Sequence, residues 1–171
     1  MHSTPQMTVQ AASQSLIEDG PAGISRAVNR MIGGIIGYAR WPAVPPSGTR
    51  RLCIIGQPRL AAPISQRLPG GYLVRAERMS AQAAMAGSRC DILFLGQLAS
   101  SDRQRLIEWV RGRPILTLTD DDPRCLYGAM FCLAARGPGL SFSVNLDAVG
   151  RGPLRIDPRV LKIGGPEGGA R

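Results

Sequence analysis

The sequence has one histidine, His2, and one lysine, Lys162, among its 171 residues. Nucleophilic catalysis by serine or cysteine normally needs a histidine as base, and His2 lies at the very start of the chain. The first buried-looking run is followed by Gly56-Gln57-Pro58-Arg59, which matches neither the dinucleotide-binding glycine pattern nor a P-loop. We therefore expect no Ser-His-Asp or Cys-His enzyme and no nucleotide cofactor.

Long apolar runs are also missing. None approaches the roughly 18–20 residues that a membrane-spanning helix needs, so we expect a chain that does not span a membrane. The first residues lack the basic and apolar regions of a signal peptide, which indicates either a cytosolic protein or a mature chain with a replaced start. The net charge of +9 comes from scattered arginines, and the few aromatics (Trp 2, Tyr 3, Phe 3) lie mostly in apolar runs, so we expect no nucleic-acid binding.

Four cysteines are present, at Cys53, Cys90, Cys125 and Cys132. They form no CxxC pair and have no histidine near them in the sequence. A structural zinc site would normally need ligand pairs two to four residues apart, and these spacings do not provide them. Two disulfides in an oxidising compartment are therefore favoured over a metal site or unpaired core thiols.

Apolar periodicity predicts alternating helices and strands. The predicted helices cover 21–41, 58–68, 80–87 with Ser80 as N-cap, and 100–112 capped by Ser100 or Ser101, with a helical turn over 157–162. The predicted strands cover 51–56, 72–77, 90–96 and 114–119, a hairpin over 129–135 and 140–146, and a short edge strand over 154–156.

This order predicts a single α/β domain over residues 21–163. Its sheet should be mixed but mainly parallel, with helices on both faces, as in a Rossmann-like three-layer sandwich. Residues 1–20 are polar and weakly periodic, so we expect them to be disordered. Residues 164–171 are expected to form a flexible tail.

Three features suggest chemistry or recognition. Asp120–Asp122 follow a predicted strand and could hold Mg²⁺ or act as a base, although we favour a solvated turn fixed by Pro123. Trp41 could anchor a partner or close the first helix onto the sheet. Arg155 lies between Leu154 and Ile156, so on a strand it points away from them, either to solvent or into an anion pocket.

The ordered motifs together resemble the YfiR family of periplasmic proteins, from about Ala27 to Ile163. The resemblance is carried by YARWP, RLCIIG, CDILFLG, RPILTLTDDDPRC, GAMFCL and LSFSVNLDAVGRGPLRIDPRVL. It implies a non-enzymatic periplasmic regulator that represses an inner-membrane diguanylate cyclase by binding its periplasmic sensor domain. An outer-membrane lipoprotein would relieve the repression, and the output would be the cyclic di-GMP level and hence exopolysaccharide and biofilm.

The resemblance also implies pairing of Cys53 with Cys90 and of Cys125 with Cys132. It suggests Arg40, Arg155 and Asp157 as a small-ligand pocket. We expect a homodimer with an exposed apolar patch. The alternative function is a periplasmic module that binds a nucleotide or amino acid, which tunes the affinity for a partner.

Overall fold

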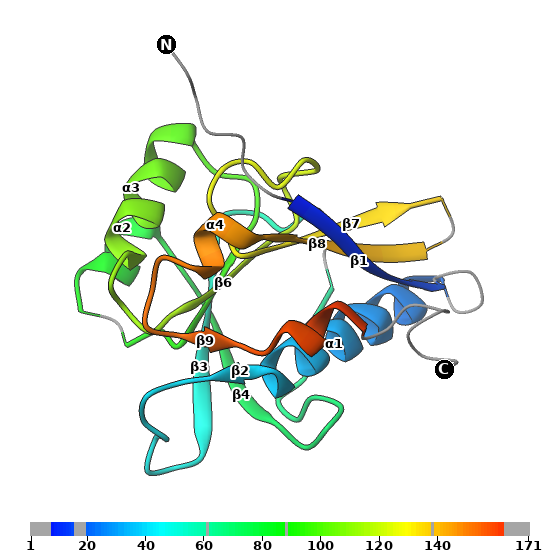
Figure 1. The fold of residues 1–171 in the computed structure, drawn as a ribbon, viewed down its shortest axis with the longest axis horizontal. Helices are drawn as coiled ribbons and strands as arrows, with labels where there is room; N and C mark the ends of the chain where they lie inside the picture. The colour runs from blue at the N-terminus through cyan, green and yellow to red at the C-terminus, as the bar shows by residue number, and fades with distance from the viewer. Residues whose placement is uncertain (1–7, 16–19, 61, 88, 138, 163–171) are drawn as a thin grey trace.

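The computed structural model describes residues 8–15, 20–60, 62–87, 89–137 and 139–162. A seven-stranded sheet runs in the order β1-β8-β7-β6-β5-β3-β4, shown in Figure 1. Its neighbours pair in parallel from β4 to β7, and β8 pairs antiparallel with both β7 and β1. The strands are β1 (Thr8–Ser15), β3 (Thr49–Ile55), β4 (Leu73–Met79), β5 (Ile92–Leu95), β6 (Leu116–Thr119), β7 (Phe131–Arg136) and β8 (Gly139–Asn145).

Helices cover both faces of this sheet. Helix α1 (Gly20–Gly37) packs on one face, and α2 (Ala81–Met85) and α3 (Ser100–Val110) pack on the other, as Figure 1 shows. The strands feed both cores by simple alternation. In β5, Ile92 and Phe94 belong to the core under α1, whereas Leu93 and Leu95 belong to the core under α2 and α3. The predicted fold class, a mainly parallel mixed sheet between two helical layers, is confirmed.

The local signals at helix ends had mixed success. Ser80 caps α2 as predicted, because its hydroxyl oxygen accepts a hydrogen bond from the Ala83 N–H at 3.0 Å. The predicted capping of α3 by Ser100 or Ser101 is wrong. Both serines lie inside the first turn, and the N-cap is Ala99, which makes no side-chain cap. A short helix α4 (Leu146–Val149) follows β8, where no helix was predicted.

The predicted helix over 58–68 is absent from the described residues there, which have irregular backbone. Helix α1 supplies the hydrogen bonds that a helix would have made internally. The Asn29 amide donates to the Pro63 carbonyl at 3.0 Å, and its oxygen accepts from the Ser65 N–H at 2.8 Å. Leu68 is fully buried and Leu60 is partly buried. The apolar spacing therefore predicted the burial of these side chains correctly but the helical conformation wrongly.

The expected disorder of residues 1–20 is not what the structure shows for Thr8–Ser15. These residues form β1 and pair with β8 along its whole length. The stabilising hydrogen bonds come from the backbone of β8, so the segment's own composition gave no sign of them. Residues 1–7, 16–19 and the expected tail over 164–171 lie outside the described residues.

A second, two-stranded sheet pairs β2 (Ala39–Arg40) with β9 (Arg155–Ile156). The short strand near Leu154 was predicted, but as an edge of the main sheet. It pairs instead with β2, directly after α1. A 3₁₀ helix (Pro158–Lys162) follows it, where a helical turn was predicted. The hairpin of β7 and β8 is also as predicted.

Asn29 is 5% exposed and holds the irregular segment against α1, so its removal has a defined cost. Asn29→Ala leaves the Ser65 N–H without its partner, and we expect the free energy of unfolding to fall by about 2 kcal/mol. Ser25→Ala removes a hydroxyl that donates to the Pro63 carbonyl at 3.2 Å and accepts from the Asn29 amide at 3.3 Å. It should cost less than about 1 kcal/mol, because the amide keeps its other acceptors and no backbone N–H loses its partner. Urea unfolding of both variants checks this, and equal costs would contradict it.

Candidate functional site

Residues 120–132, here named the disulfide corner, join β6 to β7. The Cys125–Cys132 bond closes the corner, and both cysteines are buried. Asp122, also buried, accepts hydrogen bonds from the Leu126 N–H at 3.1 Å and the Tyr127 N–H at 2.8 Å. The Asn145 amide of β8 donates to the Cys125 carbonyl at 3.1 Å. The corner is therefore braced by its own carboxylate and bridge, and Asn145 joins its middle to β8.

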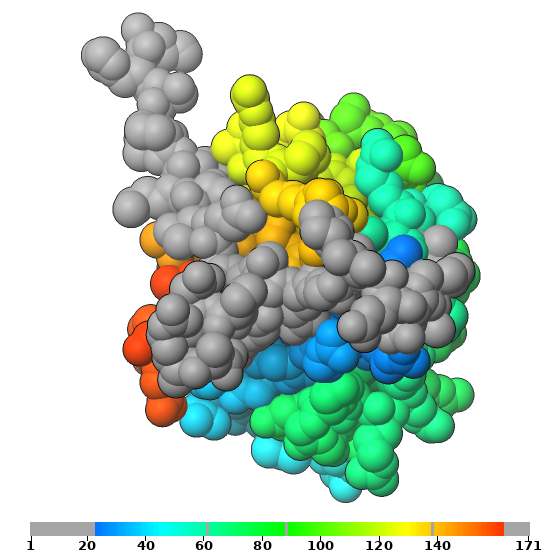
Figure 2. All heavy atoms as spheres, turned by 90° about the vertical axis from the view of Figure 1, so that its right-hand side faces the viewer, coloured from blue at the N-terminus to red at the C-terminus, as the bar shows by residue number. Residues whose placement is uncertain are grey.

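This anchoring leaves apolar side chains on the outside. Leu126 is 42% exposed, Tyr127 is 53% exposed, and Leu146 at the start of α4 is 37% exposed. Figure 2 shows the yellow segment around residues 120–130 standing out at the surface beside the gold segment of β7 and β8. None of these three residues was predicted from the sequence. The apolar pair Leu126-Tyr127 directly before Gly128, outside any predicted strand, could have signalled an exposed apolar loop.

The three carboxylates of the corner diverge to separate partners. Asp120 accepts a hydrogen bond from the Leu60 N–H at 2.9 Å, Asp121 pairs with Arg59, and Asp122 binds the corner's own backbone. Across the described residues, no group of three or more His, Cys, Asp or Glu side chains could hold a metal ion. Each carboxylate thus has a structural partner, as a turn would provide, and the expected absence of a metal or a general base here stays a prediction.

The surroundings of Asp120 shift the pKa of its carboxyl group. Its Oδ1 is buried without a hydrogen-bond partner, and burial raises the pKa of its carboxyl group above the usual value. The neighbouring charge of Asp121 raises this pKa further, while hydrogen bonds from the backbone N–H groups of Leu60 and Arg59 oppose the shift.

Arg40, Arg155 and Asp157 do come together. Arg40 and Arg155 are directly opposed across the β2–β9 ladder, and both are exposed. Hydrogen bonds from the Arg159 side chain and backbone lower the pKa of Asp157 to about 2, and the charge of Arg40 contributes less. Asp157 is already paired with Arg159, at 2.6 Å, so Arg40 and Arg155 contribute two exposed positive charges beside a compensated carboxylate.

Trp41 is half-buried next to this cluster. Its indole N–H donates to the Asp91 carbonyl at 3.3 Å, and the Arg50 guanidinium lies 3.9 Å from the centroid of its ring. The side chain also packs against the core under α1. This is the geometry of a tryptophan that closes a helix onto a sheet, and its predicted contact with a partner stays a prediction.

Both disulfides have the pairing that the resemblance implied. Cys53 in β3 bonds to Cys90, which precedes β5, and Cys125 bonds to Cys132. Among the described residues no cysteine is free. The first bridge joins neighbouring parallel strands within the core under α2 and α3, so it lies away from the disulfide corner.

Comparison with protein families now settles the relationship. The model of a family described as YfiR/HmsC-like matches residues 25–165, which is nearly the whole folded region. The chain belongs to the YfiR/HmsC-like family. The family match covers α1 from residue 25 onward, all strands from β2 to β9, and both disulfides. No helix in the described part of the chain is long and apolar enough to cross a membrane.

Among solved structures, one similar chain is a carbon–sulfur lyase involved in aluminum resistance from Clostridium novyi NT. The two share 11% identity with a TM-score of 0.41, over 73% of this chain and 40% of the lyase chain. This chain thus spans well under half of the lyase's length. A likeness this weak says nothing about activity.

The raised pKa of Asp120 predicts a specific pH dependence. As the pH falls from 7 through the folded-state pKa, folded Asp120 takes up a proton before unfolded Asp120 does, so it adds stability. Asp120→Asn removes this gain. We therefore expect the stability of the natural chain minus that of the variant to increase as the pH falls from 7 towards the ordinary aspartate pKa of about 4, as measured by urea unfolding.

Asp121→Asn is the matched control for this series. It removes a charge that raises the pKa of Asp120, so the pH-dependent gain should shrink but not vanish. A difference between the natural chain and Asp120→Asn that stays flat or decreases as the pH falls would contradict the assignment.

The two bridges should differ in what they control. Serine at Cys53 and Cys90 should cost about 4 kcal/mol, and serine at Cys125 and Cys132 roughly 2.5 kcal/mol, because the second closes a much shorter loop. Loss of the second bridge alone should speed hydrogen exchange of the Leu126 and Tyr127 amides. Unchanged exchange in that variant would show that Asp122 and Asn145 hold the corner without the bridge.

Proposed function

We propose that this chain is a periplasmic regulatory protein that represses an inner-membrane diguanylate cyclase by binding the cyclase's periplasmic sensor domain. Repression would lower cyclic di-GMP and with it exopolysaccharide and biofilm output. The observation that carries the proposal is the family match over residues 25–165. Its mode of action is recognition rather than catalysis.

The covalent structure supports the periplasmic location. Disulfides persist in oxidising compartments and are rare in the reducing cytosol. Here Cys53 and Cys125 are fully buried and Cys90 and Cys132 nearly so, so the bonds are shielded from reductants in solution. A free-thiol count on the native protein isolated from the periplasm should give zero.

The disulfide corner is the proposed contact surface for the cyclase. Binding surfaces of this kind gain most of their affinity from a few apolar and aromatic anchors. Leu126, Tyr127 and Leu146 provide such anchors on a backbone that Asp122 and Asn145 hold rigid, so little conformational entropy is lost on binding. Homodimer formation and sequestration by an outer-membrane lipoprotein belong to the same proposal, with Trp41 as the further candidate contact.

The alternative function, a module whose nucleotide or amino-acid ligand tunes partner binding, has one observation in its favour. Arg40 and Arg155 face each other across a two-stranded ladder, and Asp157 is occupied by Arg159. Two adjacent exposed guanidinium groups suit a phosphate or carboxylate. A thermal-shift screen with nucleotides and amino acids tests this alternative, and it fails if no compound stabilises the natural chain more than an Arg40→Gln/Arg155→Gln variant.

The proposal predicts which substitutions weaken the complex. Leu126→Ser and Tyr127→Ser should each weaken binding to a purified cyclase sensor domain about tenfold, the equivalent of 1.4 kcal/mol. Isothermal titration calorimetry measures the affinity, and light scattering gives the stoichiometry and tests for a homodimer.

Val44→Ser is the control, because Val44 is 77% exposed and lies outside the corner. It should leave the affinity unchanged, and urea unfolding should show that all three variants stay folded. An equal loss for Val44→Ser, or no loss for the corner variants, would place the contact elsewhere. Absence of any complex with the natural chain would overturn the proposed function itself.

A further inference from the structure

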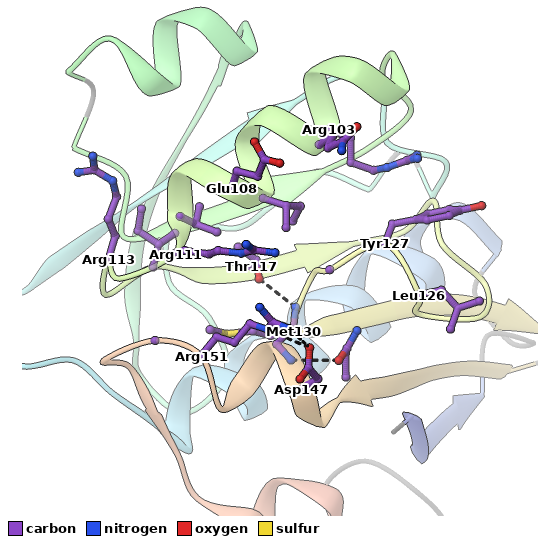
Figure 3. Close-up of a pocket in the computed structure, with 18 of the residues that line it drawn as sticks. Arg103, Glu108, Arg111, Arg113, Thr117, Leu126, Tyr127, Met130, Asp147 and Arg151 are labelled. Carbon is purple, nitrogen blue, oxygen red and sulfur yellow. Dashed lines mark hydrogen bonds and ion pairs between the residues drawn. The ribbon is translucent and has the colours of Figure 1, made fainter. Parts of the chain in front are cut away.

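A cavity of about 370 Å³ lies between α3, β6, the disulfide corner and α4. Figure 3 shows Arg103 and Tyr127 on one side of it, Asp147 and Arg151 on the other, and Thr117 and Met130 between them. Its volume falls in the range of pockets that enclose small organic ligands. None of Arg40, Trp41, Arg155 and Asp157 lines it.

The walls of the cavity are held by packing and by buried hydrogen bonds. Gly128 has φ +112°, and a Cβ there would lie 2.6 Å from Cγ2 of Ile107, so a glycine lets the corner approach α3 this closely. The Met130 N–H donates to the Thr117 hydroxyl at 2.9 Å, and the Asn145 side chain accepts from the Ala148 N–H at 3.0 Å. The cavity is therefore preformed.

The deeper part of the cavity is apolar. Ile115 and Met130 are 5% and 6% exposed, and Ile107 and Val110 of α3 are half-buried. These side chains offer a surface for an aromatic ring or a branched alkyl group, from which water would be displaced on binding.

The charged lining of the cavity has a net charge of +2, from four arginines against two carboxylates. Those residues are Arg103, Arg111, Arg113, Arg151, Glu108 and Asp147.

Three of the four arginines are engaged. The guanidinium of Arg103 lies 3.9 Å from the ring centroid of Tyr127, and that of Arg113 lies 4.5 Å from the ring centroid of Trp109. Arg151 forms an ion pair with Asp147 at 2.9 Å. Within the part of the chain that the structure describes, the Arg111 guanidinium has no ion pair and no hydrogen bond. It follows the last turn of α3 and has its full donor set available.

We propose that this cavity binds a small organic anion with an apolar body, such as an aromatic carboxylate. Ile115 and Met130 would contact the apolar body, and Arg111 would bind the anionic group through paired N–H donors. This site is separate from the Arg40–Arg155 surface, and it does not depend on the identity of a protein partner.

Three probes of matched shape test the inference: 4-phenylbutyrate, 4-phenylbutan-1-ol and 4-phenylbutylamine. The chain is labelled with ¹³C-methyl methionine, and the Met130 signal is assigned with Met130→Leu. We expect saturable movement of the Met130 signal with the butyrate, about tenfold tighter than with the alcohol, because a charged hydrogen bond contributes more than 1.4 kcal/mol. The amine should bind more weakly than the alcohol.

Arg111→Gln should weaken butyrate binding about tenfold and leave the alcohol unchanged, since it removes only the contact to the anion. Arg136→Gln, at an exposed arginine on the far end of β7, is the matched control and should change neither. The inference is overturned if Met130 does not move, if butyrate and alcohol bind equally, or if the two variants behave alike. It is equally overturned if Arg40→Gln/Arg155→Gln abolishes binding while Arg111→Gln does not.

Discussion

Double-sided burial of the central parallel strands is the constraint on which this structure depends. In β3, Leu52 faces the core under α1 and Cys53 faces the core under α2 and α3, and β5 repeats the pattern. A strand with apolar side chains on both faces is stable only between two layers, so the helices must lie on opposite sides of the sheet. The Cys53–Cys90 bridge then lies inside the second core and links β3 to the start of β5.

The second core ends at β6, and the functional features begin there. Leu116 and Leu118 still face α1, but their neighbours Thr117 and Thr119 face the other side. In β8 the same alternation places Ser141, Ser143 and Asn145 opposite Leu140, Phe142 and Val144. Since this part of the sheet presents polar groups, none of the helices in the described residues covers it with an apolar face. The disulfide corner covers it instead, and a cavity lies between the corner and α3.

The sequence could predict the features that depend on the apolar pattern of single strands. Apolar periodicity identified the strands with two buried faces. The alternating patterns LTLT in β6 and LSFSVN in β8 also indicate that one face of each strand is polar. Apolar periodicity could not foresee the irregular backbone of residues 58–60 and 62–68, because the side chains that bond to that backbone, Asn29 and Asp120, lie far away in the chain. It could not foresee β1 for a similar reason, since β8 supplies the hydrogen bonds.

Some features of the candidate sites were implied before the structure was known, and others are visible only in the structure. Cysteine pairing and the meeting of Arg40 with Arg155 followed from the resemblance to a family, not from spacing. The cavity could have been suspected only in part, from arginines spaced along the end of α3. The close approach of its walls depends on Gly128, whose role is visible only when the corner is seen against Ile107.

Tyr127 connects the two surfaces that these results single out. Its ring stacks with Arg103 at the mouth of the cavity, and it is 53% exposed on the face proposed to meet a partner. A ligand changes partner affinity only if it favours one arrangement of the shared residue over another. A ligand that contacts only Arg111 and the apolar floor would bind without consequence for the partner. One that displaces Arg103 from Tyr127 would alter the contact surface, and the partner would in turn alter the affinity for that ligand by the same factor.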